Sequence, residues 1–519
     1  IIVLVLYIWV FFNYSSSQNI SFQKLIYGEL YEQETVLCDV SQTTDGGYIL
    51  CGNIDGFVVS DPLSWVVKTD SNGEFLWSKT YNSNSYSRFN FIKQTSDGGY
   101  ITGGYTLSNP ESSILIKLTN TGDTVWTRKY CLGGELFFDL TLCNDGGYAI
   151  TGSRRCDSTC TNNDLLVTKI NTSGFVQWQK FIGKTNENDN GYSIQQTNDN
   201  GFIVCGNTSF GAGNLDVYLI KLNSSGDTIW TRTYGGLEND YGNSVIQTSV
   251  GSYLLCGTTQ SNGSGDKDVI LINVNGQGIL QWAKTYRSSF NEEGKSLAEI
   301  SGGYIIGGYQ DNNITGNDLM LIKIDYGGSI IWVKNIGTLV DEQIINISPT
   351  ADGGFVASAY LYDFSTFQSY LLKAANDGTI GLCNDIPSSI SESGITLSSG
   401  NGGIISSGFA LSSLSMIISD YIPNDSIFCF MSNVPEYNPY SQISIYPNPT
   451  TGFITIDYSV NEVNEIRIYN CFGELLHSER IDFNNEKKTV NLSNYCKGVY
   501  LMQLLTRSGS NICRKVVLE

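Results

Sequence analysis

Histidine is almost absent from this chain. Among 519 residues the single histidine is His477, which lies near the C-terminal end. A Ser/His catalytic pair, a histidine-ligated zinc site and an HExxH motif all require histidine beside the reacting atoms. We therefore expect none of these hydrolase or zinc chemistries in the long region before His477, and we find no catalytic motif there.

Proline and charged residues are also scarce. The chain has 9 proline residues and 15% charged residues, against 55 glycine and 31 tyrosine residues. This composition favours short strands joined by tight turns over helices or disorder. Acidic side chains outnumber basic ones by 50 to 30, for a net charge of −20, and such a surface repels nucleic acid and anionic lipid headgroups. We expect an all-β protein without a nucleic-acid partner.

Long apolar runs are missing after the first residues. Ile1–Phe12 is apolar and is followed by small polar residues around Ser15. The run is too short to span a bilayer as a helix, but it fits the apolar core of a secretory signal peptide. We assign residues 1–17 to a signal peptide that is truncated at its start. The prediction is an exported chain whose mature form has no transmembrane segment.

A short glycine-containing motif recurs along residues 18–383. It reads "DGGY" at Asp45, Asp97 and Asp145, "DNGF" at Asp199, "VGSY" at Val250, "SGGY" at Ser301 and "DGGF" at Asp352. The copies are spaced by about 50 residues, which is the length of one four-stranded propeller blade. Seven copies predict a seven-bladed β-propeller over residues 18–383. The aspartates are expected first of all to form turns.

A tryptophan follows a glycine by four residues in six of the repeats. The six are Trp77, Trp126, Trp178, Trp230, Trp282 and Trp332. A ligand site is rarely copied six times, whereas a packing residue is needed once per repeat, so we expect these side chains to pack between adjacent sheets. The seventh repeat has Leu382 where the other six have tryptophan. Near the N-terminus, "SFQKLIYG" resembles the strand that carries the tryptophan, with Phe22 in the tryptophan position. We expect residues 21–28 to supply the outer strand of the seventh blade and to close the ring.

The 13 cysteines cannot all pair within one chain because their number is odd. Cys51, Cys205 and Cys256 occupy one equivalent place in the repeats, where other copies have glycine or alanine, so we expect small buried apolar side chains. The spacing needed for a zinc tetrad is absent. The disulfide candidates are Cys156 with Cys160 and Cys383 with Cys429.

The repeat "LIKLNSSGDTIW" resembles the tryptophan-docking repeat of quinoprotein-type propellers and of related bacterial surface proteins. The resemblance covers about residues 20–383 and implies architecture more than chemistry. Kelch repeats are the second alternative, because they also have a glycine pair and a similar period. In kelch repeats, however, the pair ends a strand, whereas here it mostly opens one.

Residues 438–519 differ from the repeats. The pieces "YPNPTTGFITIDY", "EIRIYNCFGELLHSERI" and "YCKGVYLMQLL" indicate short alternating strands, enough for a small β-sandwich. In order and position they resemble the type A C-terminal sorting domain of the bacterial type IX secretion system. This resemblance implies a small Ig-like domain, export through the type IX machinery, and attachment to the outside of the outer membrane of a Gram-negative bacterium. The matching residues are Tyr446, Pro447, Asn448, Pro449, Gly452, Gly473, Gly498 and Tyr500.

The Ser-rich segment 384–437 joins the two regions. It is expected to be either a small β extension, held by the Cys383–Cys429 candidate pair, or a linker.

Carboxylates cluster where the outer strand of one repeat leads into the next repeat. The candidate ligand-binding residues are Asp189, Asp240, Glu293 and Asp341. Variable loops on a rigid scaffold commonly carry binding specificity, so we expect this face to bind a glycan or a protein in a cell-surface or adhesion role. No cofactor is expected, although carboxylates could hold Ca²⁺. The alternative to binding is a propeller enzyme of glycosidase or quinoprotein type, because carboxylate pairs can act in glycoside hydrolysis.

Overall fold

The computed structural model describes most of the chain from residue 21 onward. The described ranges are 21–27, 33–56, 59–82, 87–106, 112–130, 134–155, 162–184, 186–261, 266–311, 316–337, 340–362 and 367–379, the strands and adjoining residues within 385–431, and parts of 444–518. The predicted signal peptide lies outside these ranges. All regular elements that the described residues form are β-strands, which confirms the all-β expectation.

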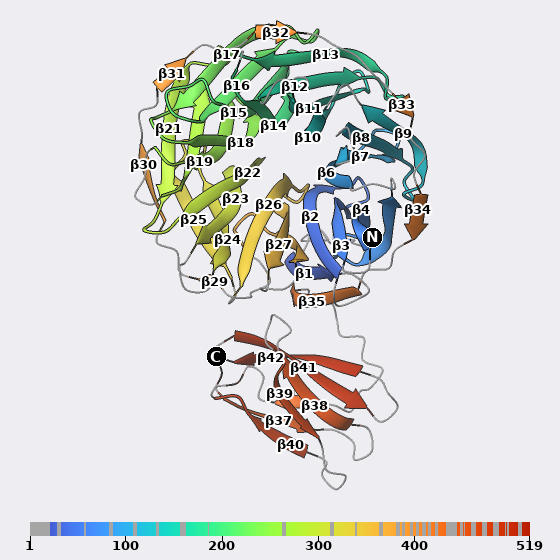
Figure 1. Ribbon diagram of the computed structural model, residues 1–519. Coiled ribbons are helices and arrows are strands. Elements are labelled where there is room, and N and C mark those ends of the chain that lie inside the picture. Colours follow the sequence, from blue (N-terminus) through green and yellow to red (C-terminus); the bar gives the residue numbers. More distant parts are fainter. Residues whose placement is uncertain are drawn as a thin grey trace, which may run out of the picture.

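Seven antiparallel sheets of five strands each form a propeller-like ring (Figure 1). We number the sheets in the order of their innermost strands. The first three contain β2 (Gln33–Gln42), β3 (Tyr48–Gly56), β4 (Val59–Thr69) and β5 (Phe75–Asn82); β6 (Ser87–Gln94), β7 (Tyr100–Thr106), β8 (Ser112–Leu118) and β9 (Thr124–Tyr130); and β10 (Glu135–Leu142), β11 (Tyr148–Arg155), β12 (Asn163–Ile170) and β13 (Val176–Gly183). The fourth and fifth contain β14 (Asp189–Gln196), β15 (Phe202–Thr208), β16 (Asp216–Leu222) and β17 (Thr228–Gly235); and β18 (Asp240–Gln247), β19 (Tyr253–Thr259), β20 (Asp268–Val274) and β21 (Leu280–Arg287). The sixth and seventh contain β22 (Glu292–Ile300), β23 (Gly303–Asp311), β24 (Asn317–Ile324) and β25 (Ile330–Ile336); and β26 (Asp341–Pro349), β27 (Phe355–Tyr362), β28 (Phe367–Ala374) and β1 (Ser21–Tyr27).

The two ends of the ring are joined by the N-terminal strand. β1 pairs antiparallel with β28 of the seventh sheet, with Phe22 opposite Lys373 and Ile26 opposite Ser369. This pairing confirms that residues 21–27 supply the outer strand of the last repeat. A sheet built from the first and last parts of the repeat region closes the ring, and β35 pairs with the outer edge of β1.

The fifth strand of every sheet comes from the segment between the repeats and the C-terminal domain. We call these strands the belt: β29 (Asp385–Ile386), β30 (Ser391–Gly394), β31 (Ser398–Gly400), β32 (Ile404–Ser406), β33 (Ser412–Ser413), β34 (Ile417–Asp420) and β35 (Asn424–Met431). They pair in turn with the sixth, fifth, fourth, third, second, first and seventh sheets. The belt therefore runs around the outside of the ring in the reverse direction (Figure 1).

The expected β extension thus has no sheet of its own within the described residues. Each short belt strand instead covers the exposed edge of a different sheet, so residues far apart in the ring share one connecting segment. Unpaired strand edges invite association with other chains, and the belt removes them. Cys383 lies outside the described residues, as does the side chain of Cys429.

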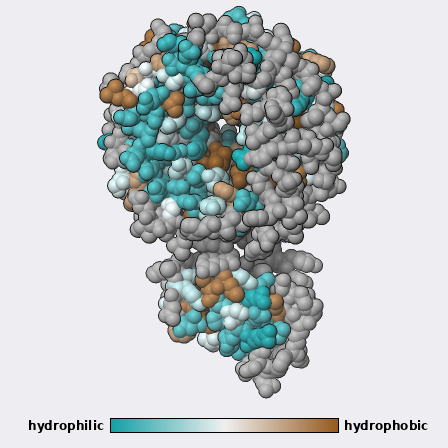
Figure 2. All heavy atoms as spheres, in the orientation of Figure 1, coloured by the Kyte–Doolittle hydropathy of each residue, from teal (hydrophilic) through white to brown (hydrophobic). Residues whose placement is uncertain are grey.

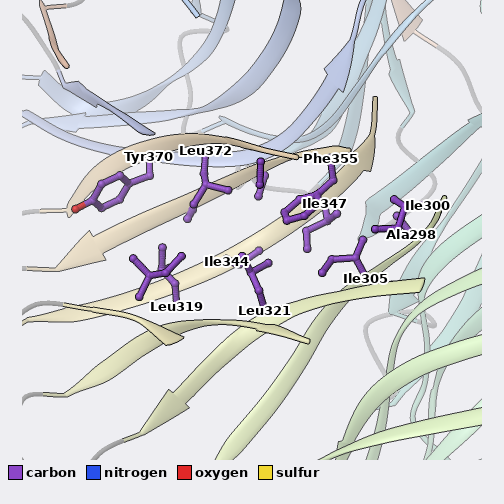
Figure 3. Packing of buried hydrophobic residues seen from close by; sticks show 14 of the residues in the cluster. Ala298, Ile300, Ile305, Leu319, Leu321, Ile344, Ile347, Phe355, Tyr370 and Leu372 are labelled. Carbon is purple, nitrogen blue, oxygen red and sulfur yellow. The ribbon is translucent and has the colours of Figure 1, made fainter. Parts of the chain in front are cut away.

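Apolar side chains from neighbouring sheets interdigitate to form the core. Between the sixth and seventh sheets, Leu319 and Leu321 on β24 face Ile344 on β26 and Leu372 on β28 (Figure 3). The middle strands of the sheets are largely buried, and β16 and β20 are buried along their whole length. Strands covered on both faces are expected to be continuously apolar rather than alternating.

The six tryptophans and Phe22 lie against the positive-φ glycines of the following sheet. A Cβ atom placed on such a glycine would lie 2.6–3.0 Å from the aromatic ring. The pairs are Phe22 with Gly73, Trp77 with Gly122, Trp126 with Gly174, Trp178 with Gly226, Trp230 with Gly278, Trp282 with Gly328 and Trp332 with Gly378.

A buried lysine anchors most of the aspartate turns. Lys221 Nζ lies 2.9 Å from Asp199 Oδ2, and the Thr197 hydroxyl donates to the same carboxylate. Equivalent pairs are Lys68–Asp45, Lys117–Asp97, Lys169–Asp145 and Lys373–Asp352. The fifth sheet has neither the lysine nor the aspartate. Asn273 stands in place of the lysine, and its side-chain amide donates a hydrogen bond to Ser252 Oγ at 3.2 Å. The turn aspartates are therefore also ion-pair partners.

The C-terminal region has two small sheets. One contains β36 (Ser444–Tyr446), β37 (Phe453–Asp457) and β40 (Lys487–Asn491), and the other contains β39 (Leu475–Arg480), β38 (Val463–Tyr469), β41 (Gly498–Thr506) and β42 (Asn511–Leu518). Ile454 and Ile456 of the first sheet pack in one buried cluster with Ile466 and Met502 of the second. These residues have a core of their own.

Candidate functional site

The four predicted ligand-binding carboxylates lie at the starts of innermost strands, in four sheets. Asp189, Asp240 and Asp341 are the first residues of β14, β18 and β26, and Glu293 is the second residue of β22. We call this end of the ring the loop face, because the connections between successive sheets lie there. No hydrogen bond or ion pair joins any two of these four described side chains. The structure therefore gives each its own surroundings.

Asp189 and Asp240 are fully buried. Asp189 Oδ2 accepts a hydrogen bond from the Lys184 amide at 3.0 Å. Burial raises the pKa of the Asp189 carboxyl to about 6, and nearby Asp164 adds to this shift. Asp240 Oδ2 accepts from the Gly236 amide and the Ser261 hydroxyl, both at 2.7 Å.

Each of these two aspartates faces a second aspartate from the preceding sheet. Asp216 begins β16, is fully buried, and meets Asp240 beside Gly235: a Cβ on Gly235 would lie 1.7 Å from Asp216 Oδ1 and 2.8 Å from Asp240 Oδ2. Burial raises the pKa of Asp216, and the neighbouring Asp240 contributes. Only glycine permits carboxylates to approach its Cα so closely.

The same arrangement recurs one junction earlier. A Cβ on Gly183 would lie 2.6 Å from Asp189 Oδ2 and 2.7 Å from Asp164 Oδ1. At the next junction, Asp268 and Glu292 occupy the same strand positions. Burial raises the pKa of Glu292, and the charge of Asp268 raises it further. Sequence reasoning missed the first member of each pair. The aspartate five residues before the repeated lysine, in "DVYLIKL" and "NDLLVTKI", marks it.

Glu293 has a different environment from the buried pairs. Its carboxylate lies 2.5 Å from Lys267 Nζ and 2.6 Å from Lys295 Nζ. Although burial opposes ionisation, the two lysines lower the pKa of Glu293 to about 2. Lys295 Nζ also lies 5.5 Å from the centre of the Tyr309 ring. Both lysine side chains are partly exposed, at 40% and 30%, so this group of residues can be reached from solvent.

The centre of the ring is lined by a bulge in every innermost strand. Each of the seven strands shifts its register at one residue. The residues at the shifts include Phe138, Tyr192, Asn243 and Lys295, all only partly buried. Bulges re-aim side chains and are frequent near functional sites. Figure 2 shows the ring hollowed at its centre. We use the name channel mouth for the contact group of Glu293, Lys267, Lys295 and Tyr309 at the loop face of the sixth sheet.

A second charged group lies among the first three innermost strands. Asp39 Oδ2 accepts from the Ile92 amide and from Lys93 Nζ, both at 2.8 Å. Burial raises the pKa of Asp139 to about 6, against the opposing attraction of Lys93. This arrangement is a salt bridge with a neighbouring acid.

Some of the other predicted site residues lie outside the described ranges. Cys156, Cys160 and Cys383 are among these, as are Pro447, Asn448, Pro449 and Gly473. Cys51, Cys205 and Cys256 are buried free thiols, as expected. Within the described residues no group of three or more His, Cys, Asp or Glu side chains is placed to hold a metal ion. No helix among them is long and apolar enough to cross a membrane.

The C-terminal residues that we expected to identify a sorting domain have structural positions typical of turns and core. Tyr446 is 43% exposed at the end of β36, and Gly452 has φ +152°. Gly498 opens β41, and Tyr500 is buried 6.0 Å from the Tyr495 ring. Residues 444–519 match the family of secretion system C-terminal sorting domains. This domain supports export of the chain and sorting to the cell surface by the type IX secretion machinery.

Several solved structures resemble the chain in part. Sqt1 from Chaetomium thermophilum is 9% identical and aligns over 67% of this chain and 100% of its own, with a TM-score of 0.40. PorZ, an essential surface component of the type IX secretion system of Porphyromonas gingivalis, is 10% identical over 93% of this chain and 82% of its own, with a TM-score of 0.25. A neuraminidase-like protein of subtype N10 from a bat influenza A strain is 9% identical over 54% of this chain and 94% of its own, with a TM-score of 0.32.

At these identities and TM-scores, the likenesses say nothing about the chain's own activity. No curated protein matches the sequence.

Proposed function

We propose that this chain is a seven-bladed β-propeller, presented on the cell surface by an Ig-like C-terminal sorting domain, that binds an extracellular glycan or protein without catalysing a reaction. The match of residues 444–519 to the sorting-domain family carries the proposal, because it directs the preceding ring to the outside of the cell. The seven repeats of about 50 residues and the seven sheets support the blade number.

The channel mouth is the proposed binding region. Of the four predicted carboxylates, Glu293 lies with two partly exposed lysines and Tyr309. Tyrosine rings offer a flat apolar surface, and charged groups at fixed distances orient a polar ligand. Asp189 and Asp240, being fully buried, are better suited to shape the surrounding loops than to touch a ligand.

The protonation and burial of the carboxyl groups favour binding over catalysis. Glu293 is held ionised between Lys267 and Lys295. A glycosidase needs one carboxyl group that keeps its proton to protonate the leaving group and a second one facing it across the substrate. Asp189 and Asp216, which have raised pKa values, are fully buried and out of reach of a substrate in solvent.

A glycan-array screen of the purified full-length chain tests the binding proposal. We expect reproducible binding that is weakened about tenfold or more in a Lys295→Ala variant, because the variant removes one charge from the channel mouth. Lys180→Ala is the matched control, since Lys180 also pairs with a carboxylate, Asp227 at 3.1 Å, but on the fourth strand of a sheet. Binding that is equal in both variants would place the ligand elsewhere. Silence on the array, and in a parallel screen against outer-surface proteins, would contradict a binding role.

A further inference from the structure

The buried carboxylate pairs at the sheet junctions have oxygen atoms without hydrogen-bond partners. Asp216 Oδ2 accepts from the Gly213 amide at 3.1 Å, and Asp240 Oδ2 accepts from Gly236 and Ser261. The Oδ1 atoms of both residues accept no hydrogen bond from any described residue, although both side chains are fully buried. Asp189 Oδ1 is in the same situation at the preceding junction.

Two buried carboxylates beside one glycine are costly unless something neutralises them. An unpaired buried charge or an unsatisfied buried oxygen destabilises the fold, and here two acids converge on one Cα, that of Gly235. A shared proton or a bound cation would relieve this cost. Carboxylate and backbone carbonyl oxygens are the ligands that calcium prefers.

Carbonyl oxygens lie close to Gly213, whose amide binds one member of the pair. The Gly213 amide binds Asp216, and a Cβ on Gly213 would lie 2.2 Å from Glu238 O and 3.1 Å from Gly236 O. The loop 236–238 leads directly into Asp240. Two carboxylates from neighbouring sheets and the carbonyls of the connecting loop are therefore gathered at one junction, which is a set of hard oxygen donors.

The ring does not need these acids in order to pack. At the junction of the first and second sheets, the two equivalent strand positions hold Leu63 and Ser87, and Ser87 Oγ bonds to Ser64 Oγ at 2.9 Å. That junction is built without a carboxylate pair. The acids at the later junctions consequently require an explanation other than sheet packing.

We propose that Asp216 and Asp240 bind a calcium ion at the junction of the fourth and fifth sheets. One junction earlier Arg154 lies opposite Asp164 and supplies a positive charge there, so we limit the proposal to the Asp216–Asp240 pair. The ion bridges neighbouring sheets from the loop face and neutralises the paired charges. This site is separate from the proposed ligand-binding region at the channel mouth, so either can exist without the other.

Calcium binding to the full-length chain tests this proposal. After chelation, calcium at about 5 mM should raise the midpoint of thermal unfolding by about 5 °C or more, because a ligand that binds only the folded state stabilises it. Isothermal titration with calcium alone should give at least one ion per chain. A change in neither quantity would overturn the proposal.

An isosteric variant locates the site. Asp216→Asn/Asp240→Asn keeps the shape and removes the charges, so it should bind one calcium fewer and show a smaller thermal shift. Asp123→Asn, which alters an exposed turn carboxylate, should respond as the unmodified chain does. If the double variant binds as much calcium as the unmodified chain, the proposed site is wrong. If the double variant is more stable without calcium and the unmodified chain does not bind the ion, the two carboxylates share a proton and the proposed site is again wrong. Should the double variant fail to fold, Asp240→Asn alone and the stoichiometry of the unmodified chain decide the question.

Discussion

Trp230 lies against Gly278, the positive-φ glycine that ends the turn Asn275–Gly278 of the next sheet, and a Cβ on that glycine would be 2.9 Å from the indole ring. The indole N–H donates to Gly276 O at 3.0 Å. Trp230 thus contacts the turn of the neighbouring sheet through both its ring and its indole nitrogen. The packing of the tryptophan therefore depends on the conformation of this turn.

Removing the indole should loosen the contact between the fourth and fifth sheets. Trp230→Ala is expected to lower stability by about 3 kcal/mol, because a large packed ring is lost. Trp230→Phe should cost about 1 kcal/mol, mainly the hydrogen bond. The measurement is thermal unfolding of the full chain, with Ile229→Ala as control because Ile229 is 55% exposed. Equal effects of Trp230→Ala and Ile229→Ala would contradict this packing role.

The turn glycine offers a matched pair of variants. Gly278→Ala places a methyl group against Trp230 and strains a backbone with φ +71°, so we expect a loss of about 1–3 kcal/mol. Gly276→Ala is two residues away, and its Cβ would meet no atom within 4 Å. It should be nearly neutral. Denaturant unfolding of both variants makes the comparison, and similar losses would show that the ring is not what restricts Gly278.

Acid should destabilise the ring through its lysine-anchored turns. Burial works against ionisation, yet hydrogen bonds from threonine and lysine lower the pKa of Asp97 and Asp199 to about 2. A lowered folded-state pKa gives stability above the ordinary aspartate pKa of 3.8, and this stability is lost as the pH falls toward 2. We expect the unfolding midpoint to fall over this range.

Asp199→Asn tests the origin of that acid sensitivity. The variant should be less stable than the unmodified chain at neutral pH and should lose less on acidification, because it has already lost the carboxylate. Glu238→Gln, at an exposed loop position, is the control. A pH profile for Asp199→Asn that is parallel to the unmodified one would show that the turns do not carry the effect.

The belt should protect the outer edges of the sheets. Ser399 in β31 pairs with Tyr234 in β17, and proline at position 399 cannot donate a hydrogen bond. In Ser399→Pro we expect faster amide hydrogen exchange in β17. Exchange in β5, which pairs with β34, should stay unchanged as an internal control. Unchanged exchange in β17 would contradict belt pairing there.

The repeat made much of the ring predictable from sequence. Glycine marks the turns because few other residues accept a positive φ, and aspartate marks them because its carboxylate accepts a hydrogen bond from the turn amide. Phe22 can be recognised because it stands where a tryptophan is expected. The pairing of β1 with β28 follows from that substitution.

The pairing of the belt strands and the carboxylate pairs could not be predicted from the sequence. Strands of two to eight residues have too little pattern to indicate their partners, and each belt strand pairs with a sheet far away in sequence. The pairing of Asp216 with Asp240 depends on how one sheet packs against the next. Sequence reasoning selected Asp189 and Asp240 as ligand candidates because carboxylates cluster where one repeat leads into the next, whereas the strand starts bury them completely.

Surface display on intact cells tests the central claim most directly. A protease added outside cells that produce the full chain should cleave the ring, and removal of residues 444–519 should leave the protein inside the cells and protected. If the truncated chain reaches the surface as efficiently as the full chain, or if the full chain stays protected from the protease, the account of a sorted surface propeller is contradicted.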